Sequence, residues 1–230
     1  MLSQAVNYLA FEDASAQSNH LAQQVAEILL QAINNDGHAS LAVSGGSTPK
    51  QMFEQLSNID IPWQHVTISL VDDRWVETDH DDSNQKLIKE SLLQNFAQNA
   101  NFIPLYQQGL NAPKAISRIN LMFKQVRQPF DVILLGMGND GHTASLFPCS
   151  EQITQGMSTS ELYLSTQPTT APYARVSLSA HAITASRHLF LQLKGLDKQQ
   201  TLEKALSQNN ELKMPIKRFL TKDITVLWCP

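Results

Sequence analysis

The residues best suited to chemistry in this chain lie in Asp131–Pro148, DVILLGMGNDGHTASLFP. A short apolar run, Val132–Leu135, leads directly into a turn that contains three glycines and then His142. A histidine side chain titrates near neutral pH, so it can accept and return a proton, and an acidic residue, Asp140, lies two positions before it. The segment therefore predicts a buried strand whose end carries a histidine for general acid–base chemistry.

Two other interpretations of this segment remain open when it is taken alone. Glycine, asparagine and aspartate are the ordinary residues of a turn that caps a following helix, with the histidine exposed on the surface. Alternatively, Gly136–Gly141 fits the G-x-G-x-x-G pattern of a dinucleotide-binding turn. That match is weak, because it lies in the middle of the chain and Asp140 would bring a negative charge close to a pyrophosphate. The other segments of the chain favour the catalytic histidine.

A second segment with the composition of a ligand site is Ser44–Lys50, SGGSTPK, which follows the apolar run Ala39–Val43. Glycines let the backbone approach an anion closely, the N–H groups at a helix start attract it, and hydroxyls add donors. Pro49 is typical of the first turn of a helix. Taken alone, the segment is explained about equally well by a phosphate loop and by a solvated turn with a helix cap. The residues expected to contact a phosphate are Ser44, Gly45, Gly46, Ser47 and Thr48.

Two further apolar runs end in charged residues. Val66–Val71 leads into Asp72, Asp73 and Arg74, and His188–Leu193 leads into Lys194. The cations could form ordinary surface contacts, which contribute little, but the planar fork of arginine is also well suited to phosphate. Asp72 could orient a substrate or a base. These strand ends are therefore candidate parts of the same site.

Apolar periodicity predicts the elements that would position these residues. We expect strands at Val6–Phe11, Ala39–Val43, Val66–Val71, Phe102–Leu105, Val132–Leu135, Leu162–Ser165, His188–Leu193 and Ile224–Trp228. We expect helices at Ala16–Ile33, around Met52–Leu56 and Leu87–Leu93, at Pro113–Val126 and at Leu196–Ser207, and a short helix that begins within Thr143–Phe147. Arg175–Leu178 should be a half-buried strand, because its apolar residues alternate with small polar ones.

Strands that alternate with helices predict a single α/β domain over residues 1–230, with a mainly parallel sheet and helices on both faces. In such a sheet the carboxyl ends of the parallel strands share one edge, where ligands bind. We therefore expect Ser44–Thr48, Arg74, His142 and Lys194 to converge.

Composition excludes several classes of function. The 230 residues include 17 basic and 21 acidic side chains, and the formal net charge of −4 disfavours a general nucleic-acid surface. Cys149 and Cys229 form no C-x-x-C pair, which favours a reducing compartment. We see no signal peptide and no apolar run that could span a bilayer. We expect a cytoplasmic protein without nucleic-acid or membrane partners, either a monomer or a small homo-oligomer.

Several motifs together resemble the 6-phosphogluconolactonases of the pentose phosphate pathway, in order along most of the chain. They are Ser44–Lys50, Asp72–Val76, Ser83-Asn84, Gly136–Pro148, the strand that begins at Arg175, and Lys194-Gly195. The resemblance implies a Rossmann-like doubly wound fold without a metal or organic cofactor. It also places Asp72, Arg74, Asn84, Arg175 and Lys194 among the substrate-binding residues.

The same superfamily contains glucosamine-6-phosphate deaminases and isomerases, which share the phosphate loop and the G-x-D-G-H turn. In those enzymes a glutamate precedes the proline that follows the histidine, whereas Thr143–Phe147 contains no acid here. This difference favours the lactonases. A sugar-phosphate deaminase or isomerase, a non-catalytic sugar-phosphate-binding regulator and a nicotinamide enzyme remain the alternatives.

The reaction implied by the resemblance is hydrolysis of 6-phosphoglucono-1,5-lactone to 6-phosphogluconate. Neutral His142 would take a proton from the attacking water and later help to protonate the ring oxygen. Asp140 would fix the imidazole tautomer and stabilise its charged form. The phosphate loop, Arg74, Arg175 and Lys194 would hold the phosphate and the lactone oxygens. The sequence has neither an H-E-x-x-H motif nor a Cys/His cluster, so we expect no metal.

Overall fold

In the computed structural model, which describes residues 5–230, the centre of the protein is a seven-stranded sheet in the order β1-β10-β9-β6-β2-β3-β5. All pairings within it are parallel, which confirms the expected α/β class. Its strands are β1 (Asn7–Ala10), β2 (Ala39–Val43), β3 (Val66–Leu70), β5 (Asn101–Phe102), β6 (Val132–Leu135), β9 (His188–Lys194) and β10 (Ile224–Cys229).

The chain reverses direction across this sheet between β2 and β6. After β2 it adds β3 and β5 on one side, and then returns to place β6, β9 and β10 on the other. Loops that leave neighbouring strands on opposite sides open a crevice at such a point, where doubly wound proteins bind ligands. The strand order therefore places the ligand-binding crevice at the carboxyl ends of β2 and β6.

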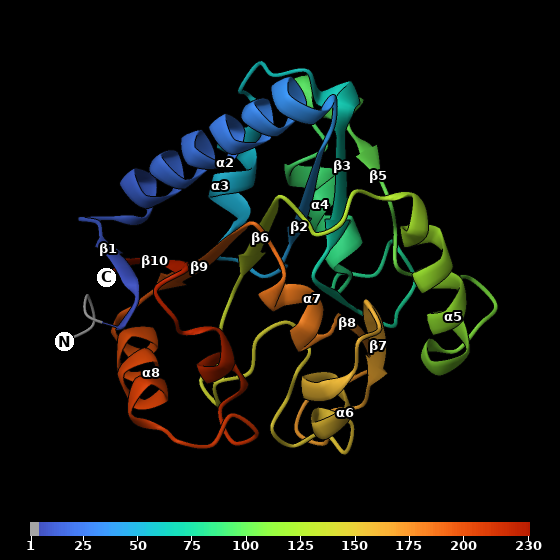
Figure 1. Cartoon of the computed structure of the whole chain (residues 1–230), viewed down its shortest axis with the longest axis vertical. Coiled ribbons are helices and arrows are strands. Elements are labelled where there is room, and N and C mark those ends of the chain that lie inside the picture. The colour runs from blue at the N-terminus through green and yellow to red at the C-terminus, as the bar shows by residue number, and fades with distance from the viewer. Residues whose placement is uncertain (1–4) are drawn as a thin grey trace.

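Helices cover the sheet on both sides, and Figure 1 shows α2 and α3 on one side of the β1–β10–β9 region and α8 on the other. The helices are α2 (Ala14–Asp36), α3 (Lys50–Ser57), α4 (Asn84–Ser91), α5 (Ala112–Met122), α6 (Ile153–Ser158), α7 (Ala180–Thr184) and α8 (Leu196–Ser207). Short 3₁₀ segments lie at η1 (Trp63–His65), η2 (Asn95–Asn99), η3 (Phe123–Gln125) and η4 (Pro215–Phe219).

Helix α2 illustrates how the sequence specifies these elements. Leu21, Val25 and Leu29 recur at four-residue intervals and are completely buried, so one face of the helix packs on the sheet. Asp13 caps the first turn by accepting a hydrogen bond from the backbone N–H of Ala16 at 2.8 Å. Gly37 ends the helix in the left-handed region, at φ 81°.

A second, antiparallel sheet lies beside the first and was not predicted. It consists of β4 (Asp72–Arg74), β8 (Arg175–Leu178) and β7 (Tyr163–Thr166), with β8 in the middle. The expectation that Arg175–Leu178 is half-buried was wrong, because all four residues are buried. Ser177, for example, is fully buried and its hydroxyl is hydrogen bonded to the backbone of Ser145 and Leu178. Polar side chains can occupy such positions when the protein satisfies their hydrogen bonds.

The expected short helix within Thr143–Phe147 was also wrong. These residues form turns with an isolated bridge between Thr143 and Leu146, and Ala144 has a φ of 50°. The reason is that their hydroxyls bind distant partners: Thr143 Oγ1 donates to the Gly136 carbonyl at 2.8 Å. Likewise, the strand expected at Phe102–Leu105 is shorter and earlier, because only Asn101–Phe102 pairs with β3.

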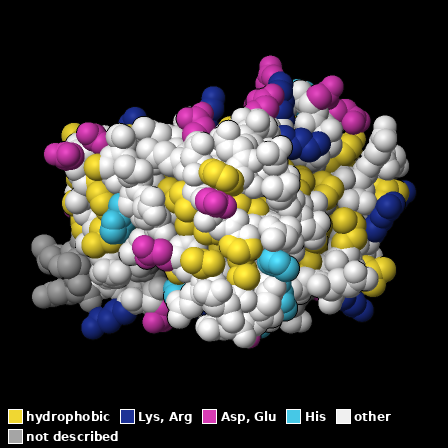
Figure 2. All heavy atoms as spheres, turned by 90° about the horizontal axis from the view of Figure 1, so that it is seen from above, with side chains coloured by type: hydrophobic (Ala, Val, Ile, Leu, Met, Phe, Trp, Pro, Cys, Tyr) yellow, Lys and Arg dark blue, Asp and Glu magenta, His cyan; other side chains and the backbone are white. Residues whose placement is uncertain are grey.

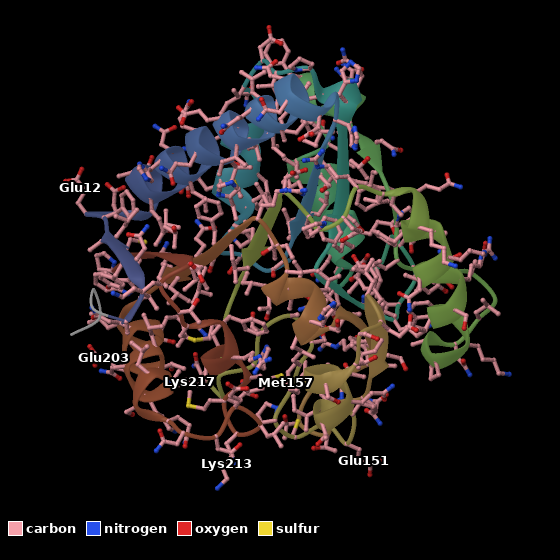
Figure 3. The ribbon with its side chains drawn as sticks, in the orientation of Figure 1. Glu12, Glu151, Met157, Glu203, Lys213 and Lys217 are labelled. Carbon is pink, nitrogen blue, oxygen red and sulfur yellow. The ribbon has the colours of Figure 1, made fainter. Side chains whose placement is uncertain are left out.

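Charged side chains lie mainly at the periphery, and Figure 3 shows Glu12, Glu203 and Lys213 projecting outward. On the face seen in Figure 2, hydrophobic side chains form small groups among polar atoms. No helix within residues 5–230 combines the length and apolar character needed to cross a bilayer.

Candidate active site

A cavity of about 310 Å³ opens at the carboxyl ends of β2, β6 and β9. This volume is at the lower end of the range for small-molecule sites. The sequence-predicted residues that line it are Ser44, Gly45, Gly46, Ser47, Thr48, Asp72, Arg74, Asn84, His142, Arg175 and Lys194. The remaining predicted residue, Asp140, does not line the cavity but contacts His142. The expected convergence of the strand ends is therefore confirmed.

The imidazole of His142 is held by a carboxylate on one edge. Its Nδ1 lies 2.6 Å from Asp140 Oδ1, and the same oxygen accepts the backbone N–H of His142 at 3.1 Å. An ionised carboxylate can only accept, so Nδ1 must carry the proton, and Nε2 of the neutral ring is left as a proton acceptor. Partial burial acts to raise the pKa of Asp140, but the hydrogen bonds from His142 and its electrostatic attraction to the carboxylate outweigh burial and lower that pKa.

The imidazole is also packed against Phe147 and Gly138. The ring of Phe147 stacks on it, with centroids 4.0 Å apart and an interplanar angle of 26°. Gly138 lies so close that a Cβ there would come within 2.1 Å of His142 Cε1. Only glycine fits at this position, so the turn and the ring conformation are specified together.

The 3₁₀ segment η4 supports the turn from outside. Gly141 has a φ of 80°, and a Cβ at this position would meet the Met214 side chain at 2.8 Å. The Gly141 carbonyl accepts the backbone N–H of Ile216 at 2.9 Å. The C-terminal part of the chain thus fixes the glycine turn that presents His142.

The predicted phosphate loop has several features that suit an anion. The helix α3 begins directly after it, with Pro49 as its N-cap and no side-chain hydrogen bond to the first turn. The first N–H groups of the helix are therefore left for a ligand, which favours the phosphate loop over the capped turn. Ser44 Oγ is buried and has no hydrogen-bond partner among residues 5–230. At Gly45, a Cβ would lie 1.8 Å from Asn84 Oδ1, so only glycine allows Asn84 to pack against the loop.

Two arginines face the cavity from the small sheet. Arg74 on β4 and Arg175 on β8 are directly opposite each other in the antiparallel pairing. Like charges at such positions repel, so the pair favours an anion between or beside them. Arg175 is only 6% exposed and its Cζ lies 5.5 Å from the centroid of the Phe147 ring. Burial lowers the pKa of Arg175, although a guanidinium remains charged at neutral pH.

Residues 12–228 match the family of glucosamine-6-phosphate isomerases and 6-phosphogluconolactonases. The chain belongs to this family. It is 36% identical over 231 residues to a 6-phosphogluconolactonase of Pseudomonas putida, covering 100% of this chain and 95% of the relative. It is 40% identical over 206 residues to one of Neisseria meningitidis serogroup B, covering 87% and 88% of the two chains. The crystal structure of a 6-phosphogluconolactonase from Shewanella baltica has 41% sequence identity and a TM-score of 0.96, covering 98% of each chain.

Two neighbouring aspartates of this family member have different contacts. Asp72 lines the cavity, and its Oδ2 accepts the Ser145 hydroxyl at 2.5 Å, which ties β4 to the segment after His142. Asp73 instead accepts the backbone N–H groups of Arg74, Asn84 and Gln85 at 2.7–3.1 Å, so it caps α4 together with Ser83. Burial raises the pKa of Asp73 to about 6. Asp73 is thus a structural residue that places Asn84.

Sequence reasoning missed two polar residues that line the cavity and lie outside the predicted motifs, Gln192 and Lys198. Lys198 lies in the first turn of α8 and hydrogen bonds to the side chain of Asn139, in the turn before His142. Gln192 is buried on β9 and donates through Nε2 to Gln17 Oε1 at 3.0 Å. The available signals were a glutamine inside an apolar strand and a lysine in the first turn of the helix expected directly after Lys194-Gly195.

Within residues 5–230, no three His, Cys, Asp or Glu side chains are grouped so that they could hold a metal ion.

Proposed function

We propose that this chain hydrolyses 6-phospho-D-glucono-1,5-lactone to 6-phospho-D-gluconate in the oxidative pentose phosphate pathway. The observation that carries the proposal is the shared cavity, in which His142 faces the phosphate loop and the two opposed arginines. The relatives from Pseudomonas putida and Shewanella baltica are lactonases that match this chain over nearly its whole length. Their similarity supports the complete reaction rather than binding alone.

In the first step, Nε2 of His142 accepts a proton from a water molecule whose oxygen attacks the lactone carbonyl carbon. The carbonyl oxygen becomes an anion, and the hydrogen-bonded Asp140 stabilises the imidazolium. In the second step, the bond between the carbonyl carbon and the ring oxygen breaks, and the ring oxygen takes the proton back from Nε2. The carboxylic acid that results then ionises.

These steps demand only modest acceleration from the protein, since the lactone is an activated ester. A positioned general base contributes about 10²–10⁴-fold, and a donor to the developing oxyanion contributes about 10²–10³-fold more. Both can come from side chains and backbone groups of this chain, so we propose a reaction that uses no metal or organic cofactor.

The anion-binding groups would hold the substrate. The loop Ser44–Thr48 and the start of α3 supply backbone N–H groups and hydroxyls for the phosphate. Arg74, Arg175, Lys194 and Lys198 add positive charge around the cavity. Asp72 and Asn84 complete the polar lining, where they can accept or donate hydrogen bonds to sugar hydroxyls.

Lactone hydrolysis is favoured over sugar-phosphate deamination or isomerisation. The residue before Pro148 is Phe147, whereas the deaminases and isomerases have a glutamate before this proline. The ring of Phe147 stacks on His142. The relatives named above are all lactonases. The partner is therefore a small sugar-phosphate lactone. We further propose a cytoplasmic location without nucleic-acid or membrane partners, in line with the free cysteines and the net charge of −4.

An assay with the purified protein tests this function. The lactone is generated in place by an oxidising enzyme, and the appearance of 6-phosphogluconate is timed against spontaneous hydrolysis. We expect a rate well above the spontaneous one and no release of ammonia from glucosamine 6-phosphate. A rate equal to the spontaneous one would contradict the proposal.

A further inference from the structure

Each of the two opposed arginines is held by a backbone carbonyl of a neighbouring loop. Arg74 donates through Nη1 to the Asp82 carbonyl at 2.6 Å, in the loop between β4 and α4. Arg175 donates through Nε and Nη2 to the Pro172 carbonyl at 3.3 and 3.1 Å, in the loop between β7 and β8. The directions of both guanidinium groups therefore depend on the conformations of these two loops.

The two loops are joined by a side-chain hydrogen bond. The Tyr173 hydroxyl donates to the Asp82 carboxylate at 3.0 Å. Tyr173 directly follows Pro172, whose carbonyl binds Arg175. Asp82 is the residue whose backbone carbonyl binds Arg74. The ring of Tyr173 also packs edge-on to His80, with centroids 5.7 Å apart. His80 Nδ1 in turn accepts the backbone N–H of Asp82 at 3.0 Å. Asp82 is thus fixed from both sides.

The backbone of Tyr173 is strained. Its φ is 69°, a left-handed conformation that is unfavourable for a bulky residue. Such conformations persist only where the surroundings hold them, and they concentrate at functional sites. Here the next residue is held as well, because the Ala174 carbonyl accepts the backbone N–H of Trp75 at 2.8 Å. Tyr173 therefore lies between Pro172, whose carbonyl binds Arg175, and strand β8, which begins at Arg175.

We propose that Tyr173 and Asp82 are positioning residues, and that their hydrogen bond sets the two arginines in the geometry that receives the phosphate of the substrate. This inference rests on the proposed function. Arg74 and Arg175 carry like charges at opposite positions of neighbouring strands, and the nearby carboxylate of Asp72 offsets their repulsion. Linking the loops that hold them preorganises the pair and reduces the ordering that binding would otherwise require.

The expected effect lies in substrate binding and not in stability. An exposed hydrogen bond contributes little to the free energy of unfolding, and Asp82 is about half exposed. In Tyr173→Phe the ring remains and only the hydroxyl is lost. We expect KM for the phospholactone to rise about fivefold to tenfold, the equivalent of one hydrogen bond. The value of kcat should stay within about twofold, because His142 is untouched.

The chain offers a matched control. Tyr106 donates its hydroxyl to Glu77 Oε1 at 2.6 Å, also on the surface and also to the loop between β4 and α4. Neither residue is hydrogen bonded to Arg74 or Arg175, whereas Asp82 is bonded to Arg74. Tyr106→Phe should therefore leave KM and kcat unchanged. Asp82→Ala keeps the carbonyl that holds Arg74 and should match Tyr173→Phe. The double variant Tyr173→Phe/Asp82→Ala should be no weaker than either single variant, since both remove one interaction.

Calorimetric binding of 6-phosphogluconate to the same proteins separates this inference from the proposed function. If Tyr173→Phe binds 6-phosphogluconate more weakly than Tyr106→Phe does, the positioning role of the Tyr173–Asp82 hydrogen bond is supported. This holds even if the wild-type protein hydrolyses no lactone, in which case only the proposed function fails. Equal binding by wild type, Tyr173→Phe and Tyr106→Phe would overturn the positioning role of this hydrogen bond without contradicting the proposed function. A fall in kcat with KM unchanged would also overturn it.

Discussion

The imidazole of His142 stacks on the ring of Phe147, with centroids 4.0 Å apart. Together with the hydrogen bond to Asp140, this contact fixes both the plane and the tautomer of the ring. The Arg175 guanidinium lies over the same Phe147 ring, with its Cζ 5.5 Å from the centroid. One apolar side chain therefore contacts both the proposed base and one of the proposed anion-binding groups.

Replacing Phe147 by leucine should lower kcat by about threefold to thirtyfold, because an imidazole that rotates spends less time in the reactive geometry. The value of KM should change less than kcat. The measurement is steady-state kinetics corrected for spontaneous hydrolysis, with Phe147→Tyr as the control that keeps an aromatic face. A Phe147→Leu protein with the wild-type kcat would show that the stacking has no role in turnover.

Two glycines in the turn should differ sharply when replaced by alanine. In Gly138→Ala the new Cβ would lie 2.1 Å from the His142 ring, so the ring must move. At Gly136 a Cβ meets no protein atom within 4 Å. We expect at least about a tenfold loss of kcat for Gly138→Ala, because misplaced catalytic groups are costly, and a much smaller loss for Gly136→Ala. The measurement is kcat of the two variants under the same conditions. Equal losses of kcat would show that contact between Gly138 and the His142 ring does not control turnover.

The raised pKa of Asp73 predicts a pH-dependent stability. Burial raises this pKa to about 6, above the value of about 3.9 expected in the unfolded chain. The protonated form is therefore favoured by folding, and its contribution is complete below about pH 4 and is lost as the pH rises through 6. The loss amounts to at most about 3 kcal/mol of unfolding free energy.

Urea unfolding of wild type and Asp73→Asn between pH 4 and pH 7.5 measures this effect. Asparagine does not titrate, so the wild type should lose stability relative to the variant as the pH rises. The loss of cap interactions in Asp73→Asn changes the difference in unfolding free energy between the two proteins by a constant amount. The test is therefore the slope of that difference with pH. A difference that does not change with pH would mean that Asp73 titrates alike in the folded and unfolded states.

Much of the site could be predicted from the sequence because its parts follow apolar strands. The loop at Ser44 and the turn at His142 each come directly after a buried run, and parallel strands bring such ends to one edge. The carboxylate partner of His142 was also recognisable, because Asp140 lies only two residues away. These features are local in the sequence, and the rules of α/β topology supply the rest.

The features that were not predicted depend on contacts between distant residues. The small antiparallel sheet depends on the pairing of β4 with β8, which places Arg74 opposite Arg175. Alternation predicted the strand at Arg175, but no local pattern indicates which strand it pairs with. The segment after His142 looked helical, but Ser145 is held by Asp72 from a different strand. Lys198 is hydrogen bonded to Asn139, which is 59 residues away along the chain, so only the fold shows this contact.

The most direct test of the account is the kinetics of His142→Ala, with the substrate concentration varied and the spontaneous rate subtracted. If His142 is the general base, kcat should fall by about 10²-fold or more while KM stays within a few-fold of the wild-type value. A His142→Ala protein that retains a near-normal kcat would contradict the central claim that this imidazole takes the proton from water.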